Sequence, residues 1–522
     1  MSDLSPWFSL VAIIWLQSIS GTNTDFPAYS SHLKSRLGIT QVQLNNLAVA
    51  SDAGKVLGLL SGIFARHLPL WSVLIVGTTV GFVGYGVQFL FLADKVETLS
   101  YWQFILLQVL AGNSICWVNT VCYTASMRRF PEDYGVVIGL VTSYSGLSAK
   151  IYVALLQTIQ RTKLAGDKNV YLLLNCCTPL ASSVLTAPLL LRESESTKSS
   201  GNSVMLLFVF VIAGLTGSYA IVETLVPALT SSTFTPTLLL VMVGLVAVVP
   251  LLRFCQRLRG GDQVPVQAVG EGEASGAELV DREITGDEVA AAEEEGEEAK
   301  DVRREYSVWK LASSSDFWMY YLVYLCGGTL GLVYSNNLGQ IAESRSVPGV
   351  ILLSIFSSFG FYGKLSTAPL SLYARNKYMS SRPMFIAFLM APMASSFFLL
   401  LSNSKISLLI STAIIGTCTG AITSIAVSMT SDLFGYEHFS VNHNIVITNI
   451  PVGSLLFGYI AARIYDHEGG SGGEGAGVCL GVHCYRMTFL VWGWICSMGT
   501  ILSFVLYIRT RRFPISTIIG TS

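Results

Sequence analysis

Fourteen apolar segments, separated by polar links, follow one another along this chain. Each is close to the roughly 20 residues that a helix needs to cross the hydrocarbon core of a membrane. They fall into groups of six, two and six: Trp7–Ser30, Leu44–Phe64, Trp71–Ala93, Trp102–Thr124, Val136–Ile159 and Val170–Leu191; Val204–Val226 and Leu238–Cys255; Phe317–Leu338, Val350–Leu372, Met384–Leu401, Leu408–Met429, Asn442–Ile464 and Met487–Ile508. The pattern predicts an all-α polytopic membrane protein.

One long polar segment interrupts the series. Between Arg257 and Arg304 no stretch is apolar enough to span, and the run Glu293–Glu298 is typical of a solvated, flexible linker. We therefore predict a six-helix half over residues 1–200, two additional helices over 201–256, an acidic loop over 257–315, a second six-helix half over 316–510 and a tail over 511–522.

The basic residues near the helix ends predict the orientation. An even number of spans places both termini on one side, and that side carries the larger share of Lys and Arg, which favours the cytosol for the termini and the acidic loop. The first residues, Met1–Pro6, lack the basic region of a cleavable signal peptide, so we expect the first helix to direct insertion. The plasma membrane and an endomembrane, vacuolar or of the endoplasmic reticulum, both fit this pattern.

Composition narrows the classes of function. The chain is 52% hydrophobic and 12% charged, whereas soluble domains carry about 25% charged residues. The net charge of −1 gives no sign of a nucleic-acid partner. The sequence has no Gly-rich phosphate loop and no nucleophile elbow, so we expect neither an enzyme nor an ATP-driven pump, and no cofactor.

Asp52 and Lys55 are the most informative polar residues, because a charge at the bilayer centre costs roughly 2.5–3.5 kcal/mol on insertion scales. They are three residues apart and therefore share a helix face. They could form an internal ion pair that only permits insertion. Alternatively, Lys55 meets an anionic solute while Asp52 tunes it or carries a proton.

Other polar side chains within the apolar segments are further candidates for binding or coupling. They are Asn23, Asp25, Asn113, Asn119, Tyr144 and Lys150 in the first half, and Asn336, Asn337, Gln340 and Lys364 in the second. Lys150 either snorkels or projects into a cavity, and Lys364 is expected near the cytosolic end, where snorkelling is the simpler explanation. We expect a structural role for Glu223 and either an interfacial or a proton-sensitive role for His443.

Most of the ten cysteines lie inside apolar segments, where they pack as small apolar residues. Cys479 and Cys484 differ, because they lie in the last loop on the non-cytosolic side. If that side is oxidising, they are placed to form a disulfide. A metal site would need more ligands than these two thiols and His483 supply, so no metal is expected.

Several motifs resemble the plant nodulin-like domain. They are Trp7-Phe8, Ile19–Thr22, Leu33–Gln41 and Gly139–Ser148, with Tyr334–Ile341 in the second half. The resemblance covers nearly the whole chain. It implies a nuclear-fusion-defective-type protein of the major facilitator superfamily, similar to the oxalate/formate antiporter branch. The implied fold has two six-helix halves around a midplane site. The two helices predicted between the halves are additions to this twelve-helix core.

One position departs from the superfamily pattern. The loop after the second helix keeps Gly62 and Ala65, but Arg66 stands where the superfamily has an aspartate that locks the cytosolic ends together. The equivalent place in the second half, near Gly363, also lacks the acid. The resemblance therefore does not predict the usual gating bond for this chain.

Two functional hypotheses follow. The first is a secondary active or facilitative transporter that works by alternating access; Lys55 and Lys150 favour a small organic anion such as a monocarboxylate, with proton coupling through Asp52 or Asp25. The second is a membrane sensor or interaction protein that acts through the acidic loop. Both place the chain in a lipid bilayer, and neither specifies an oligomeric state.

Overall fold

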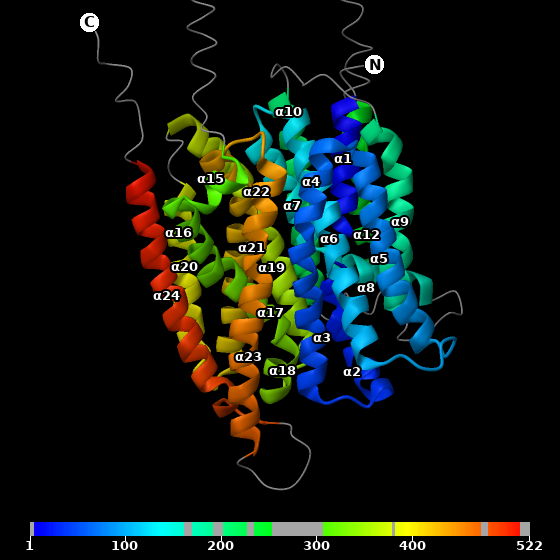
Figure 1. Cartoon of the computed structure of the whole chain (residues 1–522), viewed down its shortest axis with the longest axis vertical. Helices are drawn as coiled ribbons and strands as arrows, with labels where there is room; N and C mark the ends of the chain where they lie inside the picture. The colour runs from blue at the N-terminus through cyan, green and yellow to red at the C-terminus, as the bar shows by residue number, and fades with distance from the viewer. Residues whose placement is uncertain are drawn as a thin grey trace, which may run out of the picture.

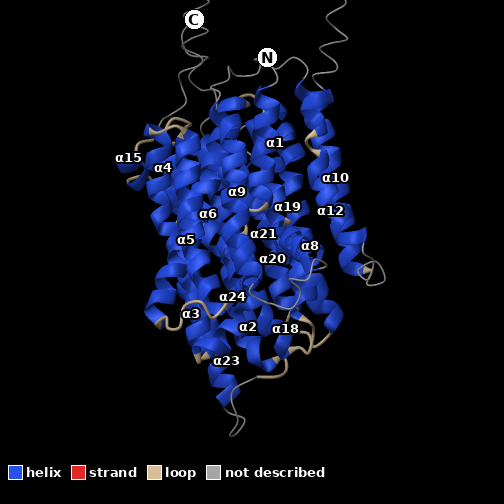
Figure 2. Cartoon of the chain, turned by 90° about the vertical axis from the view of Figure 1, so that its right-hand side faces the viewer, coloured by secondary structure: helices blue, strands red, loops and turns tan. Residues whose placement is uncertain are grey.

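The structure, a computed structural model, describes residues 5–160, 170–191, 202–226, 234–252, 306–377, 382–470 and 479–511. These residues form helices joined by turns and loops, and no strand occurs among them (Figure 2). The expected all-α architecture is confirmed. Residues 257–305 of the expected acidic loop and residues 512–522 of the tail lie outside the described residues.

The first half of the chain contains the helices of the first six apolar segments. They are α1 (Ser5–Ser18), η2 (Thr22–Asp25), α2 (Phe26–Leu37), α3 (Gln41–Ala53), η3 (Gly54–Leu57), α4 (Gly58–His67), α5 (Leu70–Leu92), α6 (Tyr101–Arg129), α7 (Tyr134–Gly146), α8 (Ser148–Gln160) and α9 (Val170–Leu191). Capping boxes begin two of them. The Thr40 and Ser100 side chains accept from the backbone of Gln43 and Gln103, whose side chains bond back.

The second half repeats this arrangement after two additional helices. The additional helices are α10 (Asn202–Leu225) and α12 (Phe234–Leu245), and the second half contains α15 (Val308–Ala312), α16 (Ser315–Tyr324), the π-turn η4 (Leu325–Thr329), α17 (Leu330–Asn336), α18 (Leu338–Ser344), α19 (Gly349–Lys377), α20 (Arg382–Leu399), α21 (Lys405–Phe434), α22 (Phe439–Ile447), α23 (Asn449–Gly470) and α24 (His483–Arg511). α1 begins and α24 ends on the same side of the bundle (Figure 1). We call this side the terminal end and the opposite side the distal end.

All fourteen predicted segments fall on helices, although not all are straight spans. Among the described residues, ten helices are long and apolar enough to cross a membrane, and α7 with α8, bent by 43°, makes an eleventh. The first segment is broken between α1 and α2 by η2, and α12 is short. The remaining segment forms α19, a continuous helix of 29 residues with Lys364 in its interior.

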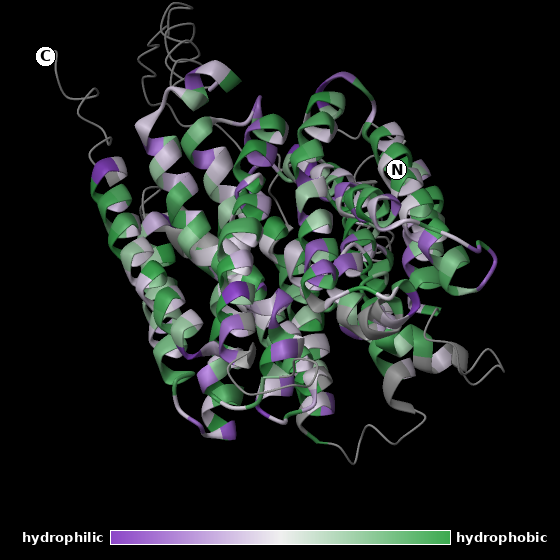
Figure 3. Cartoon of the chain, turned by 60° about the horizontal axis from the view of Figure 1, so that its bottom comes forward, coloured by the Kyte–Doolittle hydropathy of each residue, from purple (hydrophilic) through white to green (hydrophobic). Residues whose placement is uncertain are grey.

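The outer surface of the bundle is apolar. Leu185, Leu455 and Trp494 expose 76%, 64% and 66% of their surface, and similar side chains line the other outward faces. Hydrophilic residues instead gather at the helix ends and in the middle of the bundle (Figure 3). An apolar exterior around a polar interior is the arrangement expected of a multi-pass membrane protein.

The two halves meet along two seams. α3, η3 and α4 pack against α22 and α23, and α7 packs against α19. Small residues allow the close approach: a Cβ atom added at Gly62 would lie 2.5 Å from the Ser440 carbonyl oxygen, and one at Gly139 would lie 2.8 Å from the Ala368 nitrogen. Cores of buried apolar side chains flank these seams, one mostly in each half.

The two additional helices pack over the seam between α7 and α19 rather than standing apart. α10 contacts α7 and α19, and α12 contacts α8 and α10 (Figure 2). The Tyr362 hydroxyl of α19 donates to the Gly214 carbonyl at 2.8 Å and lies 2.5 Å from the Ser218 hydroxyl. Trp15 of α1 donates to the Val243 carbonyl at 3.2 Å. α10 therefore contacts both halves of the bundle.

Lys150 does not project into the central cavity, which was one of the two positions predicted for it, but points towards α10. Its ammonium donates to the Ala220 carbonyl and the Thr224 hydroxyl and lies 3.7 Å from a carboxylate oxygen of Glu223. The two side chains are only 10% and 16% exposed. Because each charge offsets the other, Lys150 and Glu223 allow α8 and α10 to pair within the apolar bundle.

We predict that Glu223→Gln destabilises the protein, because it leaves the Lys150 charge without its acid. The expected loss is roughly 2 kcal/mol or more in unfolding free energy, measured as a lower melting temperature of the purified protein. The double substitution Lys150→Met/Glu223→Leu should recover most of the loss, while Glu97→Gln, at an exposed position, should have no effect. A double variant less stable than Glu223→Gln would contradict this account.

Candidate functional site

A central cavity of about 260 Å³ lies between the two halves. Its wall is built from η2, α2, α3, η3, α6 and the end of α7 in the first half, and from α16, α17, α19, α21, α22 and the start of α23 in the second. The wall is mixed in character, with apolar side chains and a limited number of polar ones. The polar groups that concern us are Asn23, Asp52, Lys55, Asn119, Ser145, Asn336, Lys364 and His443.

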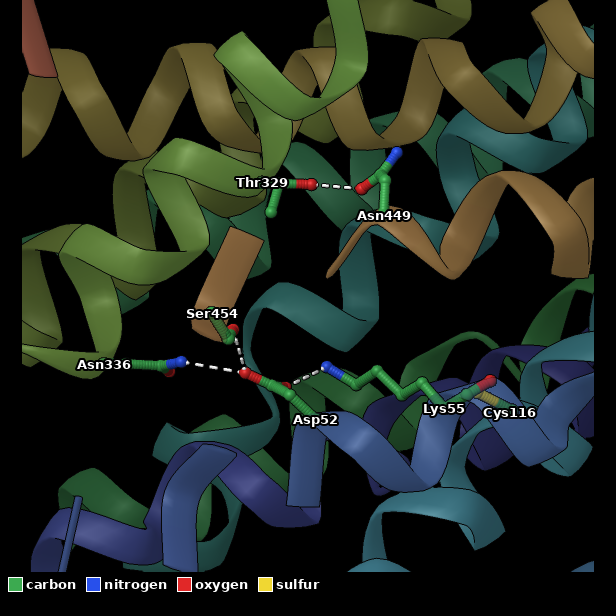
Figure 4. A network of polar contacts seen from close by, with 7 residues as sticks. All are labelled: Asp52, Lys55, Cys116, Thr329, Asn336, Asn449 and Ser454. Atoms are coloured by element: carbon green, nitrogen blue, oxygen red, sulfur yellow. Dashed lines mark hydrogen bonds and ion pairs between the residues drawn. The ribbon is translucent and has the colours of Figure 1, made fainter. Parts of the chain in front are cut away.

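A break in the second span places Asp52 and Lys55 at this cavity. The break is the short 3₁₀ turn η3, and it lies against α6, where a Cβ atom at Gly54 would be only 2.1 Å from the Val109 carbonyl oxygen. Lys55 donates to the Asp52 carboxylate at 2.6 Å, and both residues are buried. Figure 4 shows the pair with the Lys55 side chain extended towards the carboxylate.

The second carboxylate oxygen of Asp52 crosses to the other half. It accepts from the Asn336 amide of α17 at 3.0 Å and from the Ser454 hydroxyl of α23 at 2.5 Å (Figure 4). One acid therefore neutralises Lys55 and also joins the two halves. Hydrogen bonds to a charged group contribute about 1.5–3 kcal/mol each when buried, so Asp52 is a strong cross-half contact.

A second polar contact between the halves lies further towards the distal end. Gln340 of α18 donates to the Asn45 side chain of α3 at 3.1 Å and accepts from the Tyr485 hydroxyl at 2.7 Å. Tyr485 follows the disulfide that joins Cys479 to Cys484. The halves are thus joined by polar contacts on the distal side of the cavity.

Lys364 is the second lysine of the central cavity, although the sequence favoured snorkelling at a membrane surface. It lies in the interior of α19, and its ammonium donates to the Ser145 hydroxyl of α7 at 2.7 Å. The two residues belong to the seam where α7 and α19 meet. Within the described part of the chain, Lys364 has no acidic partner.

The charged side chains that line the cavity in the described ranges carry a net positive charge. Among the Asp, Glu, Lys and Arg residues that line it in the described ranges, Asp52 offsets Lys55 and leaves Lys364 uncompensated. A lysine ammonium inside a membrane protein is costly unless a counter-charge approaches it. The arrangement therefore suits an anion.

A single hydrogen bond and one hydrogen-bonded chain complete the polar wall. Asn119 accepts from Gln17 at 2.9 Å. On the terminal side, Asn444 of α22 donates to the Thr120 hydroxyl of α6 at 2.9 Å, and Thr120 lies 2.8 Å from the Ser61 hydroxyl. These contacts leave amide and hydroxyl groups at the cavity surface that can bind a polar solute.

Several predicted residues lie elsewhere. Asn113 accepts from its own helix neighbour Trp117 at 3.2 Å, and Asn337 donates to the Val333 carbonyl at 2.8 Å, so both serve local structure. Tyr144 is buried with its ring edge-on to Phe361 at 5.9 Å. The backbone of Asp25 ends η2, and its side chain lies outside what the structure describes.

The structure also contains site residues that the sequence did not suggest. Ser454 binds Asp52, and Thr120 links Asn444 to Ser61. Serine and threonine in apolar helices carry little signal, because each can also bond to a carbonyl of its own helix. The Ser454 and Thr120 hydroxyls matter at the cavity because each contacts a residue of the opposite half, Asp52 and Asn444 respectively.

At the terminal end, Arg66 forms an ion pair that joins the two halves. It donates to the Glu437 carboxylate of the opposite half at 3.1 Å and lies 2.5 Å from a ring nitrogen of His438. Asp432 of the second half accepts from the Tyr134 hydroxyl and pairs with Arg382 at 2.9 Å. Arg66 thus stands in the first half where the superfamily has an aspartate, and its carboxylate partner, Glu437, belongs to the second half.

Comparison with known proteins shows the family to which the chain belongs. A family model described as Nodulin-like matches residues 6–253, and one described as NFD4, C-terminal domain, matches residues 301–516. Protein NUCLEAR FUSION DEFECTIVE 4 of Arabidopsis thaliana is 40% identical over 526 residues, which cover 97% of this chain and 89% of that protein. The chain belongs to the nodulin-like family. The resemblance seen in its sequence motifs is confirmed.

A solved structure and a distant relative extend the comparison for this nodulin-like protein. The major facilitator superfamily proton:xylose symporter XylE superposes with a TM-score of 0.54 at 8% identity, over 96% of this chain and 95% of that one. This likeness confirms the major facilitator fold. Probable transporter MCH1 of Yarrowia lipolytica is 25% identical over 188 residues, which cover 34% of this chain and 38% of that protein.

We predict that Asp52→Asn loosens the distal contact between the halves of the nodulin-like protein. The substitution removes the charge that binds Lys55, Asn336 and Ser454, so hydrogen–deuterium exchange should become faster in α17, α18 and α23. Asp316→Asn, which affects an exposed pair with Arg509 at the terminal end, is the matched control. Unchanged exchange in Asp52→Asn would show that the carboxylate does not hold the halves together.

Proposed function

We propose that this nodulin-like protein is a secondary active or facilitative transporter that moves a small organic anion, such as a monocarboxylate, by alternating access. The major facilitator fold, with a polar cavity between two halves, supports transport in general. The distant relative named as a probable transporter supports it as well. We also propose that the terminal end faces the cytosol, on the bias of basic residues near the helix ends.

The observation that carries the anion proposal is the excess charge of Lys364. Its ammonium borders the cavity with only the Ser145 hydroxyl as its described ligand, while Lys55 already has Asp52. A carboxylate entering the cavity would provide the missing counter-charge in a site of low dielectric, where the attraction is stronger than in water. A neutral solute would leave that charge uncompensated.

The Asp52 network supplies a way to couple binding to opening. A solute carboxylate that approaches Lys55 competes with Asp52 for the ammonium and leaves the Asp52 charge buried without its cation, which favours its movement towards water and away from Asn336 and Ser454. Loss of these contacts would open the cavity towards the distal end. At the terminal end, the Arg66–Glu437 pair would have to break in the opposite step of the cycle.

We predict that Lys364→Gln lowers anion counterflow at least about tenfold, the effect of losing a charge-assisted contact of roughly 1.5–3 kcal/mol. The assay uses purified protein in liposomes preloaded with monocarboxylates, dicarboxylates, amino acids or sugars, with and without a proton gradient. Lys364→Arg should retain activity because it keeps the charge. Lys405→Gln, at an exposed position at the start of α21, is the control.

Three results would contradict the proposal. One is counterflow of neutral sugars but not of anions. Another is anion counterflow that survives unchanged in Lys364→Gln, since the excess charge would then have no part in binding. Silence across the whole panel, with protein shown to be folded by its melting transition, would also count against organic-anion transport.

A further inference from the structure

One amide of the central cavity is held in a fixed orientation with its donors unused. It belongs to Asn119, which lies half-buried on α6 and lines the cavity. The Gln17 side-chain nitrogen donates to the Asn119 side-chain oxygen at 2.9 Å, and the Gln17 oxygen accepts from the Ser20 hydroxyl at 3.4 Å. The Asn119 nitrogen has no hydrogen-bond partner among the described residues. Asn119 therefore offers N–H donors, and not its oxygen, to a solute.

The break after α1 connects this amide with Lys364. Gln17, the partner of Asn119, lies in the last turn of α1, and Gly21 follows four residues later. A Cβ atom added at Gly21 would lie 3.4 Å from the carbonyl oxygen of Ser145, whose hydroxyl accepts from the Lys364 ammonium at 2.7 Å. Four residues of chain span at most about 14 Å. Asn119 and Lys364 therefore lie along one short stretch of the cavity wall.

Asn23 provides a second amide on the same stretch. It lies in η2, two residues after Gly21, and lines the cavity half-buried. No hydrogen bond joins its side chain to another residue that the structure describes. Its neighbour Thr22 instead contacts α5, where the Tyr85 hydroxyl donates to the Thr22 hydroxyl at 2.8 Å. This stretch of the wall thus carries one ammonium and two amides.

The charges of the cavity restrict the group that these amides bind. Lys364 is the lysine whose charge a solute carboxylate would neutralise, because Lys55 already has Asp52. A second carboxylate or a phosphate on the solute would stand in the cavity without a cation of its own, which is costly in a site of low dielectric. A neutral oxygen carries no such cost, and an amide N–H donates to it readily. The wall therefore fits a solute with one carboxylate and one neutral oxygen.

We propose that the central cavity selects oxo- or hydroxy-monocarboxylates, with Asn119 as a specificity-determining residue. This inference rests on the proposed function, since it takes Lys364 as the ligand of the carboxylate. The Asn119 amide donates to the keto or hydroxyl oxygen of the solute, and Asn23 supplies a second donor. An unsubstituted acid leaves these N–H groups without an acceptor, and a site that binds an oxygen discriminates against the analogue that lacks it.

The test compares the binding of butanoate, 2-oxobutanoate and 2-hydroxybutanoate to purified full-length protein by calorimetry. These acids have the same charge and differ only at the carbon beside the carboxylate. Wild-type protein should bind each substituted acid at least about tenfold more tightly than butanoate, because butanoate leaves the N–H groups of Asn119 unpaired. This comparison needs no variant, so it tests the inference even if a substitution at Asn119 disturbs folding.

Variants assign the preference to Asn119. Asn119→Leu, which is close to the wild type in size, should lose the preference and bind butanoate within about threefold of wild-type protein. Asn403→Leu, at an exposed position between α20 and α21, should keep the preference. Should Asn119→Leu show no melting transition, Asn119→Ala takes its place, because a smaller side chain fits beside Gln17. A preference that survives the loss of the amide would overturn the role of Asn119.

Lys364→Gln separates this inference from the proposed function. The variant should weaken the binding of all three acids by a similar factor of at least about ten, while the substituted acids keep their advantage over butanoate. Equal binding of the three acids to wild-type protein would leave the carboxylate site intact and overturn the inference alone. Failure of all three acids to bind would overturn the proposed function and the inference together.

Discussion

A charge inside the membrane needs a counter-charge or a set of polar ligands, and this requirement governs where the lysines of this protein lie. Lys55 is paired with Asp52 beside the central cavity, and Lys150 is paired with Glu223 between α8 and α10. Lys364 has only a hydroxyl ligand among the described residues. Because Asp52 and Glu223 already neutralise Lys55 and Lys150, Lys364 is the lysine whose charge an anion would neutralise. The proposed function rests on that one difference.

The same requirement links charge to movement. Asp52 neutralises Lys55 with one oxygen and binds the second half with the other, so any event that alters the ion pair also alters the contact between the halves. At the terminal end, Arg66 and Glu437 are 40% and 62% exposed, and an exposed pair contributes about 1 kcal/mol or less. The distal contact, which is buried, should therefore be the harder of the two to open.

Much of the fold could be read from the sequence, because apolar segments of membrane-spanning length are a strong signal. The spacing of three also placed Asp52 and Lys55 on one helix face, with an ion pair as one of the two alternatives. The roles of Lys150 and Lys364 could not be assigned in this way. Both lie in helices of similar composition, and helical spacing does not reveal which face meets the other half and which meets α10. The position of α10 itself depends on packing over the seam, which leaves no motif. Ser454 escaped notice because a serine can also satisfy its own backbone.

The central claim is that the cavity selects its solute by negative charge through Lys364. The most direct measurement is calorimetric binding of a monocarboxylate that shows counterflow, compared with its neutral amide, to wild-type protein and to Lys364→Gln. The account predicts that wild-type protein binds the carboxylate at least about tenfold more tightly than the amide, a difference of about 1.4 kcal/mol, and that Lys364→Gln loses this preference. Equal binding of the carboxylate and the amide to wild-type protein would contradict it.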